Sequence, residues 1–262
     1  MRCVHPVSDG SGRRVPCGRC ISCRINRGQE WKDRLLHELD SWDCASFLTL
    51  TYNAEHYPES GSLVKDDLQK FFKRYRKWKG EDRIRYYAVG EYGDTTARAH
   101  YHAIVFGGKE DDDYLGCWKN GNIYVGSVTE QSIAYVTDYV NKKLYGEKAK
   151  KEYGKRLPPF SLMSKGMGKE WLSRNESFVL QNLGLKRQGR VYSMPRYYMK
   201  RLSNVFTDEV KNEMLLERSR RKLEMEAELG IDPLEVWKRE IEERRQVEAD
   251  QAFWESVRIS KL

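Results

Sequence analysis

The sequence predicts an α+β protein, in which an antiparallel β-sheet is combined with amphipathic helices. Residues 84–91 and 98–106 are rich in β-branched and aromatic side chains and are joined by a short stretch of turn residues, so we expect them to form a β-hairpin. Residues 44–52 have the same character and are nearly uncharged, as expected of a central strand. Apolar residues recur at helical spacing in residues 24–42 and 63–79, which predicts two helices that each bury one face.

Two further regular elements follow the hairpin. Residues 122–128 are expected to return as another strand. Residues 129–145 are expected to form a helix, because apolar residues again recur at helical spacing. Ser127 and Glu130 have the spacing of a capping box at its start.

The rest of the chain up to residue 202 predicts shorter or irregular structure. Residues 146–169 are rich in Lys and Gly and contain two consecutive prolines, so they are expected to form a basic loop. The acidic triplet Asp111-Asp112-Asp113 is expected to lie in a solvated loop. Short elements are expected at residues 175–183 (a helix), 186–194 (an exposed hairpin) and 195–202 (a helix that starts with a proline).

The net charge of +8 is unevenly distributed. Residues 1–206 carry 36 Lys and Arg against 24 Asp and Glu, whereas residues 207–262 carry 11 against 15. The basic part is also rich in Tyr and Trp, and cationic surfaces with aromatic platforms suit a single-stranded nucleic acid. The acidic part predicts two highly charged helices, with no residues that suggest chemistry.

No stretch of the sequence approaches the ~18 consecutive apolar residues of a transmembrane helix. The first residues, Met1-Arg2-Cys3-Val4-His5-Pro6, lack the apolar core of a signal peptide. We therefore expect a cytoplasmic protein that makes no use of a membrane and whose thiols stay reduced.

Four cysteines open the chain with a spacing that suggests a structural zinc site. Cys17, Cys20 and Cys23 form two overlapping C-x-x-C pairs, and a loop separates them from Cys3. Four thiolates suffice for a closed tetrahedral zinc site, which stabilises a segment too small to build its own core. His5 could replace one ligand. Free thiols and disulfides are the alternatives, and the expected reducing compartment argues against disulfides.

The second strand of the predicted hairpin carries two histidines on one face. Side chains alternate along a strand, so His100 and His102 point one way and Tyr101 points the other. If the turn is centred on residues 95–96, Glu91 falls opposite His100, with Cβ atoms ~5 Å apart. Two imidazoles and one carboxylate could then share a metal ion. A half-buried hairpin whose histidines are merely hydrogen-bonded is the alternative.

The helix predicted at residues 129–145 carries Tyr135, Tyr139 and Lys142 on one stripe, at positions i, i+4 and i+7. Tyrosines at helical spacing usually pack in a core. A lysine on the same stripe fits a purely structural role less well.

Taken together, these motifs resemble those of the HUH endonuclease superfamily of rolling-circle replication initiators, and in particular the initiators of small single-stranded DNA bacteriophages of the microvirus, gokushovirus-like group. Three stretches resemble the motifs of that family in their order, namely Phe47-Leu48-Thr49-Leu50-Thr51-Tyr52, His100-Tyr101-His102 and Tyr135-Val136-Thr137-Asp138-Tyr139-Val140-Asn141-Lys142. The cysteine cluster and the stretches at residues 163–168 and 194–198 are similar to further signatures of the phage group. The resemblance covers roughly residues 3–202.

The resemblance implies the HUH endonuclease fold, with a central antiparallel sheet of about five strands flanked by helices. A Cys-rich, zinc-like segment would precede this fold, and charged helices would follow it. The expected divisions of the chain are residues 1–23, 24–206 and 207–262.

The resemblance also implies an activity, that of a sequence-specific nickase and strand transferase. His100, His102 and Glu91 would hold Mn²⁺ or Mg²⁺, and a tyrosine would attack the DNA backbone to leave a 5′-phosphotyrosine and a free 3′-hydroxyl. Tyr139 is favoured as the stronger nucleophile because Lys142 lies three residues further on, and Tyr135 is the alternate. Cys3, Cys17, Cys20 and Cys23 would hold structural Zn²⁺.

The partners implied are single-stranded origin DNA and, from the host, a helicase and a DNA polymerase. The place of action implied is the cytoplasm of an infected bacterial host. Two other classes of function are kept open. A non-catalytic, zinc-stabilised module that binds single-stranded nucleic acid would need no ion at Glu91, His100 and His102. A metal-dependent hydrolase or oxygenase would leave Tyr139 and Lys142 without a role.

Overall fold

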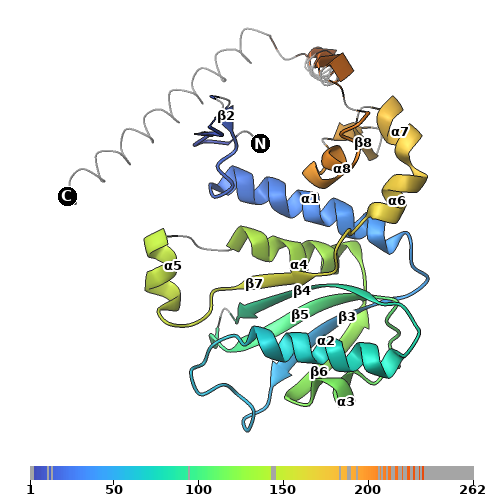
Figure 1. Cartoon of the computed structure of the whole chain (residues 1–262). Coiled ribbons are helices and arrows are strands. Elements are labelled where there is room, and N and C mark those ends of the chain that lie inside the picture. The colour runs from blue at the N-terminus through green and yellow to red at the C-terminus, as the bar shows by residue number, and fades with distance from the viewer. Residues whose placement is uncertain are drawn as a thin grey trace, which may run out of the picture. The chain divides into compact units, whose positions relative to one another are not determined.

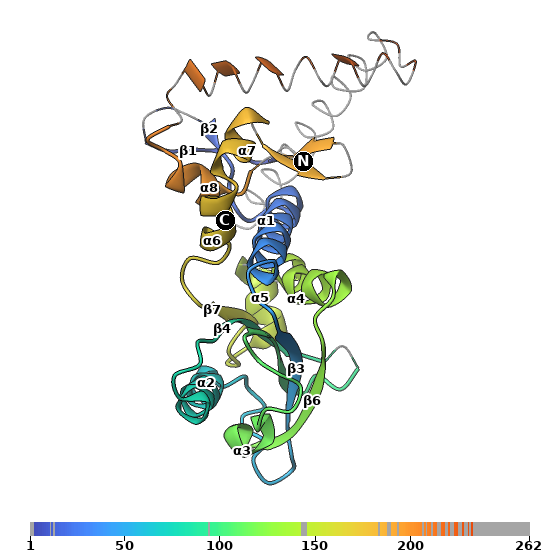
Figure 2. The ribbon, with the colours of Figure 1, turned by 90° about the vertical axis from the view of Figure 1, so that its right-hand side faces the viewer.

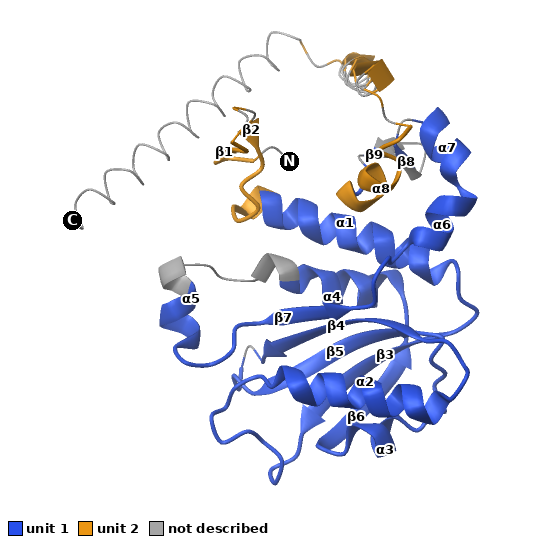
Figure 3. Cartoon of the chain, viewed as in Figure 1, with its two compact units in different colours: residues 1, 23–195 blue, residues 2–22, 196–262 orange. Residues whose placement is uncertain are grey.

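The structure, a computed structural model, divides the chain into two units, which comprise residues 23–195 (unit 1) and residues 2–22 with 196–262 (unit 2) (Figure 3). It describes residues 3–232 except 11, 13, 94, 143–145, 183, 188–189, 193, 206, 208, 211, 214–215, 218–219, 221–222, 225–226, 228–229 and 231. At residues 140–142, 146–148, 186–187 and 190–191 it describes the backbone but not the side chains. The boundaries at 23/24 and 206/207 expected from the sequence stay a prediction.

Unit 1 contains most of the regular elements, and α1 enters it from the last two residues of unit 2. In chain order they are α1 (Ile21–Leu39), β3 (Ala45–Tyr52), α2 (Lys65–Lys79), β4 (Arg85–Tyr92), β5 (Ala99–Phe106), α3 (Tyr114–Trp118), β6 (Gly121–Ser127), α4 (Glu130–Lys142), α5 (Gly146–Tyr153), β7 (Phe160–Met163), α6 (Lys169–Arg174), α7 (Glu176–Gln181), β8 (Leu185–Arg187) and β9 (Arg190–Tyr192).

Unit 2 contains the short strands β1 (Val7–Ser8) and β2 (Arg14–Val15) and the helix α8 (Arg196–Arg201). The described residues between 209 and 227 are helical, in agreement with the first of the two predicted C-terminal helices. The second predicted helix falls on residues 233–256, which lie outside the described residues. Among the described helices, none combines the length and the apolarity needed to cross a bilayer.

The centre of unit 1 is a five-stranded antiparallel sheet in the order β6-β3-β5-β4-β7 (Figures 1 and 2). The predicted α+β class is therefore confirmed. The hairpin β4–β5 has the predicted register, with Glu91 opposite His100. Strand β5 ends before Gly107, whose φ of +79° few other residues adopt, and a Cβ there would lie 2.6 Å from the carbonyl oxygen of Arg83.

Helices cover both faces of the sheet, as Figure 1 shows. The alternation of β3 sends Leu48 and Leu50 toward α2 and α3, where Phe71 and Trp118 complete a fully buried core. On the other face, α1 and α4 contribute a second core, whose buried members include Leu35, Ile104, Ile133, Val136 and Met167. The two histidines of β5 have the same parity as Ile104, so they belong to the α1/α4 face.

Tyr101 points away from the histidines, as predicted, and ties β5 to the start of α2. Its ring is fully buried. Its hydroxyl accepts a hydrogen bond from Val64 N at 2.8 Å and lies 3.0 Å from Val64 O and 2.8 Å from the hydroxyl of Tyr52. Burial, ahead of these polar contacts, raises the pKa of Tyr101 to about 12, so this hydroxyl stays neutral.

The expected basic loop at residues 146–169 is wrong, because this stretch contains α5 and β7. Strand β7 pairs with β4 at the sheet edge, with Ser161 opposite Val89. The segment after β7 is fixed from below by the buried carboxylate of Glu38, which accepts a hydrogen bond from Gly168 N at 2.7 Å and pairs with Arg85 at 2.9 Å. A four-residue edge strand whose partner is 70 residues away leaves little local signal among lysines and glycines.

The acidic triplet is not a solvated loop either. Asp112 bonds to the hydroxyl of Tyr75 at 2.5 Å and pairs with Lys79 at 3.2 Å, and both charged side chains are almost fully buried. Asp113 caps the short helix α3 by accepting a bond from Gly116 N at 2.8 Å. The sequence prediction overlooked this five-residue helix.

The cap of α4 also differs from the expected pair of Ser127 and Glu130. Thr129 and Ser132 cap each other, with Ser132 N donating to Thr129 Oγ1 at 3.2 Å and Ser132 Oγ lying 2.8 Å from Thr129 N. Glu130 instead pairs with Lys32 of α1 at 2.7 Å.

Candidate metal centre and tyrosine helix

Three polar side chains meet on the α1/α4 face of the sheet, where β4 and β5 approach their hairpin turn. Glu91 and His100 are direct cross-strand partners, and His102 follows two residues later on the same face. The Nε2 atoms of His100 and His102 lie 2.8 Å and 3.0 Å from the same oxygen, Glu91 Oε1. One ligand atom from each of the three residues lies within 4.8 Å of the others, so the predicted convergence is confirmed.

The carboxylate is shielded from solvent and stays ionised. The side chains of Glu91 and His102 are each 7% exposed, and that of His100 is 18% exposed. Burial opposes ionisation of Glu91, but the hydrogen bonds with His100 and His102 outweigh it and hold the pKa of Glu91 below its usual value. A buried carboxylate beside two imidazoles is a ligand set that can bind a divalent metal ion.

The far nitrogen of each imidazole is held by a second contact. His100 Nδ1 lies 3.1 Å from the carbonyl oxygen of Arg98, and His102 Nδ1 lies 3.0 Å from Thr49 Oγ1. Metal-binding histidines commonly have such a partner, because it fixes the ring orientation and leaves the other nitrogen to the metal.

Thr49 and Phe47 belong to the site but were not identified from the sequence. Thr49 pairs directly with His102 across β3 and β5. The ring of Phe47 lies parallel to that of His102, with centroids 5.7 Å apart. The available signal was the alternation of the strand at residues 47–51, which places both side chains on one face, but the pairing of β3 with β5 had to be known to use it.

Helix α4 brings both predicted tyrosines to this centre. The hydroxyl of Tyr135 lies 3.4 Å from His102 Nε2, and the two rings meet edge to face. The ring of Tyr139 lies nearly parallel to that of His102, with centroids 6.0 Å apart. Tyr135 is 46% exposed and Tyr139 is 9% exposed. Of the two, Tyr135 is therefore the more accessible to a molecule that arrives from solvent.

Lys142 is the last residue of α4. Its side chain lies outside the described part of the structure, so its predicted place beside Tyr139 is not tested.

The four N-terminal cysteines form a second cluster of possible metal ligands. The sulphur atoms of Cys3, Cys17, Cys20 and Cys23 lie within 4.8 Å of one another. Backbone N–H groups point at these sulphurs, from Cys17 to Cys3 Sγ at 3.2 Å and from Cys20 to Cys17 Sγ at 3.4 Å. All six cysteines of the chain are free thiols. Four sulphurs in this arrangement could hold one metal ion.

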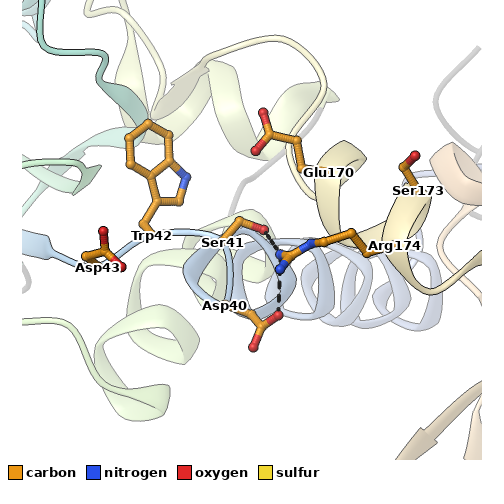
Figure 4. A pocket seen from close by; sticks show the side chains of 7 residues that line it. All are labelled: Asp40, Ser41, Trp42, Asp43, Glu170, Ser173 and Arg174. Atoms are coloured by element: carbon orange, nitrogen blue, oxygen red, sulfur yellow. Dashed lines mark hydrogen bonds and ion pairs between the residues drawn. The ribbon is translucent and has the colours of Figure 1, made fainter.

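A pocket of about 560 Å³ lies at the end of α1, away from the triad (Figure 4). It is lined by Asp40, Ser41, Trp42, Asp43, Glu170, Ser173 and Arg174. The guanidinium of Arg174 contacts both Ser41 Oγ and Asp40 within it. Carboxylates outnumber basic groups in this lining, which does not suit a phosphate ligand, so the pocket is not part of the candidate site.

Comparison with known proteins gives consistent relatives. The model of a family of replication-associated proteins of the ORF2 type matches residues 45–144, which run from the start of β3 to just beyond α4. The replication-associated protein VP4 of Bdellovibrio phage phiMH2K is 32% identical over 244 residues, which cover 76% of each chain.

Two further relatives are similar to the chain. The replication-associated protein ORF2 of Spiroplasma virus 4 is 30% identical over 233 residues, 74% of this chain and 69% of the relative. The replication-associated protein ORF4 of Chlamydia phage 1 is 28% identical over 228 residues, 74% of this chain and 55% of the relative. No solved structure matches the chain significantly.

Proposed function

The chain belongs to the family of phage replication-associated proteins that includes VP4 and ORF2, and we propose that it initiates phage DNA replication by nicking single-stranded origin DNA with a tyrosine. The observation that carries this proposal is the hydroxyl of Tyr135, 3.4 Å from a histidine nitrogen that converges with a second histidine and a glutamate. This combination of a sheet-borne triad and a helix-borne nucleophile also supports the HUH endonuclease fold.

Glu91, His100 and His102 fit a divalent ion, and we propose Mn²⁺ or Mg²⁺. The fit rests on the convergence of two Nε2 atoms on one carboxylate, with both Nδ1 atoms already engaged elsewhere. When bound, the ion would polarise the scissile phosphate and stabilise the negative charge added to it. Glu91, with its lowered pKa, keeps its charge for this purpose at neutral pH.

The tyrosine carries out the covalent step. Its phenolate oxygen forms a bond to the phosphorus of a backbone phosphate, and the bond between phosphorus and the 3′-oxygen breaks. The 5′-phosphate remains on the tyrosine and the leaving strand gains a 3′-hydroxyl. The phosphotyrosyl bond replaces a phosphodiester, so its energy is available for rejoining without ATP.

Two tyrosines allow the reaction to run twice. A rolling-circle initiator must cleave the regenerated origin while it still holds the first 5′ end, and one nucleophile is then occupied. Tyr135 and Tyr139 lie one helical turn apart, and both rings approach His102. The sequence favours Tyr139 for the first cleavage, whereas the exposure and the shorter approach of Tyr135 favour Tyr135. We propose Tyr135 for the first cleavage and Tyr139 for the second.

The remaining assignments follow from the same proposal. Lys142, three residues beyond Tyr139, would supply positive charge to the phenolate or the phosphate. The cluster of Cys3, Cys17, Cys20 and Cys23 would hold one structural Zn²⁺, for which four thiolates are the common ligand set. The protein would act in the cytoplasm of an infected bacterium, where a host helicase and a host DNA polymerase would unwind and extend the nicked strand.

A nicking assay with single-substitution variants tests the proposal. The substrate is end-labelled single-stranded DNA that carries the phage origin, with and without Mn²⁺. Tyr135→Phe should lose most initial nicking, whereas Tyr139→Phe should nick but fail to release circular strands. The reverse pattern would assign the first cleavage to Tyr139. Normal nicking by the double variant would rule out both tyrosines as nucleophiles.

A further inference from the structure

We propose that Tyr124 is a stacking platform for a base of the single-stranded DNA, beside the metal centre. This inference rests on the proposed function and adds a residue that contacts the substrate. Tyr124 lies on β6, the edge strand, opposite Thr49, and Thr49 lies opposite His102 on the next strand. The three side chains therefore share one face of the sheet, and the Cα atoms of Tyr124 and His102 are about 10 Å apart, two strand spacings.

The sheet face around Tyr124 is open. Helix α4 packs on β4 and β5, whereas β6 is covered by α3 on its other face, where Ile123 and Val125 join the buried core. Alternation turns Tyr124 away from that core, and its side chain is 66% exposed. This exceeds the exposed fraction of Tyr135, which reaches the metal centre from α4. A strand of DNA bound at the triad would meet Tyr124 on the same surface.

The ring of Tyr124 is supported from beneath by a glycine. Gly126 lies two residues further along β6 on the same face, and a Cβ added to it would lie 3.1 Å from Tyr124 Cε1 and 3.5 Å from its hydroxyl oxygen. The far end of the ring therefore lies over the Gly126 backbone. Gly126 is not in the left-handed region of φ, so its backbone does not require glycine. Glycine weakens a strand, and close approach of another group is a common reason for it.

The charge of this surface suits a polyanion. Six positions of β3 and β6 face this side, and none of them carries a carboxylate: Phe47, Thr49, Thr51, Asn122, Tyr124 and Gly126. Glu91 is the nearby carboxylate, and it is turned into the triad. An isolated exposed aromatic residue is common on protein surfaces. Here, however, an aromatic ring lies on a glycine, on an uncharged surface, two strands from the metal ligands. Those are the features of a platform on which a base can stack.

Fluorescence anisotropy with two labelled oligonucleotides separates stacking from attraction of the backbone. One probe is an oligothymidylate, and the other is an abasic oligomer of the same length, both with the full-length protein in EDTA to prevent cleavage. Wild-type protein should bind the oligothymidylate more tightly than the abasic probe. Tyr124→Ala should weaken binding to oligothymidylate about tenfold and leave binding to the abasic probe unchanged. Tyr124→Trp should retain wild-type binding.

Two further variants sharpen the test. Gly126→Ala should displace the ring and weaken oligothymidylate binding, but it should add nothing in the Tyr124→Ala background. Trp78→Ala is the matched control, because Trp78 is an aromatic residue that is 49% exposed on α2, on the opposite face of the sheet, and its loss should not alter the preference for bases. Equal binding of oligothymidylate by Tyr124→Ala and wild-type protein, or an equal loss for both probes, would overturn the proposal.

The stacking inference and the proposed nicking can fail separately. If wild-type protein nicks origin DNA but Tyr124→Ala binds both probes normally, the stacking inference is wrong and the proposed function stands. If Tyr124→Ala loses the preference for bases but wild-type protein does not nick, the platform stands on a DNA-binding protein without the proposed activity.

Discussion

Replacement of Thr49 by valine should weaken metal binding without disturbing the fold. Valine has nearly the shape of threonine, but it removes the hydroxyl that lies 3.0 Å from His102 Nδ1. His102 would then keep its Nε2 contact with Glu91 but lose the partner that fixes its ring, whereas His100 keeps its own partner, the carbonyl of Arg98. One of three ligands is affected, so the loss should fall at the lower end of the range for such partners, about tenfold in Mn²⁺ affinity, or ~1.4 kcal/mol.

The assay is calorimetric titration of metal-free protein with Mn²⁺, with thermal melts to verify folding. Thr51→Val is the matched control, because Thr51 is the next residue on the same face of β3 and its hydroxyl contacts only a backbone carbonyl, that of Asn122, at 3.4 Å. It should bind Mn²⁺ as tightly as the wild type. Unchanged affinity of Thr49→Val, or an equal loss in both variants, would refute the role given to Thr49.

Three further outcomes are expected. Tyr101→Phe should lower the free energy of unfolding by about 1–3 kcal/mol in urea titrations, since it removes a fully buried hydroxyl that bonds to Val64 and Tyr52; a stability equal to the wild type would contradict that reading. Cys20→Ser should reduce the bound zinc from one equivalent toward zero in elemental analysis, and wild-type protein without zinc would exclude the structural Zn²⁺. A protein that ends before Thr207 should still nick single-stranded DNA in the presence of Mn²⁺, and a folded but inactive truncation would show that the acidic segment belongs to the catalytic part.

The elements that organise the site were predictable because each has a local signal. Strand alternation placed His100 and His102 together, and the arithmetic of a hairpin turn placed Glu91 opposite His100, as the register confirms. The 3.6-residue period placed Tyr135 and Tyr139 on one stripe of α4. Each of these inferences needs only residues that are close in the sequence.

The features that escaped prediction depend on contacts between distant segments. Thr49 joins the metal centre only because β3 pairs with β5, and 53 residues separate it from His102. Strand β7 is recognisable through its pairing with β4 rather than through its own composition. Asp112 was expected in solvent because three adjacent aspartates usually are, but the positive charge of Lys79 and the hydroxyl of Tyr75 allow its burial.

The most direct test of the central claim is to map the covalent bond between protein and DNA. Wild-type protein would be incubated with single-stranded origin DNA and Mn²⁺, digested with protease and nuclease, and examined by tandem mass spectrometry. The account predicts a 5′-phosphonucleotide on the hydroxyl of Tyr135 at early times, on Tyr139 as well at later times, and on neither residue when EDTA replaces Mn²⁺. DNA cleavage without any adduct on these two tyrosines, or an adduct that forms equally well in EDTA, would contradict it.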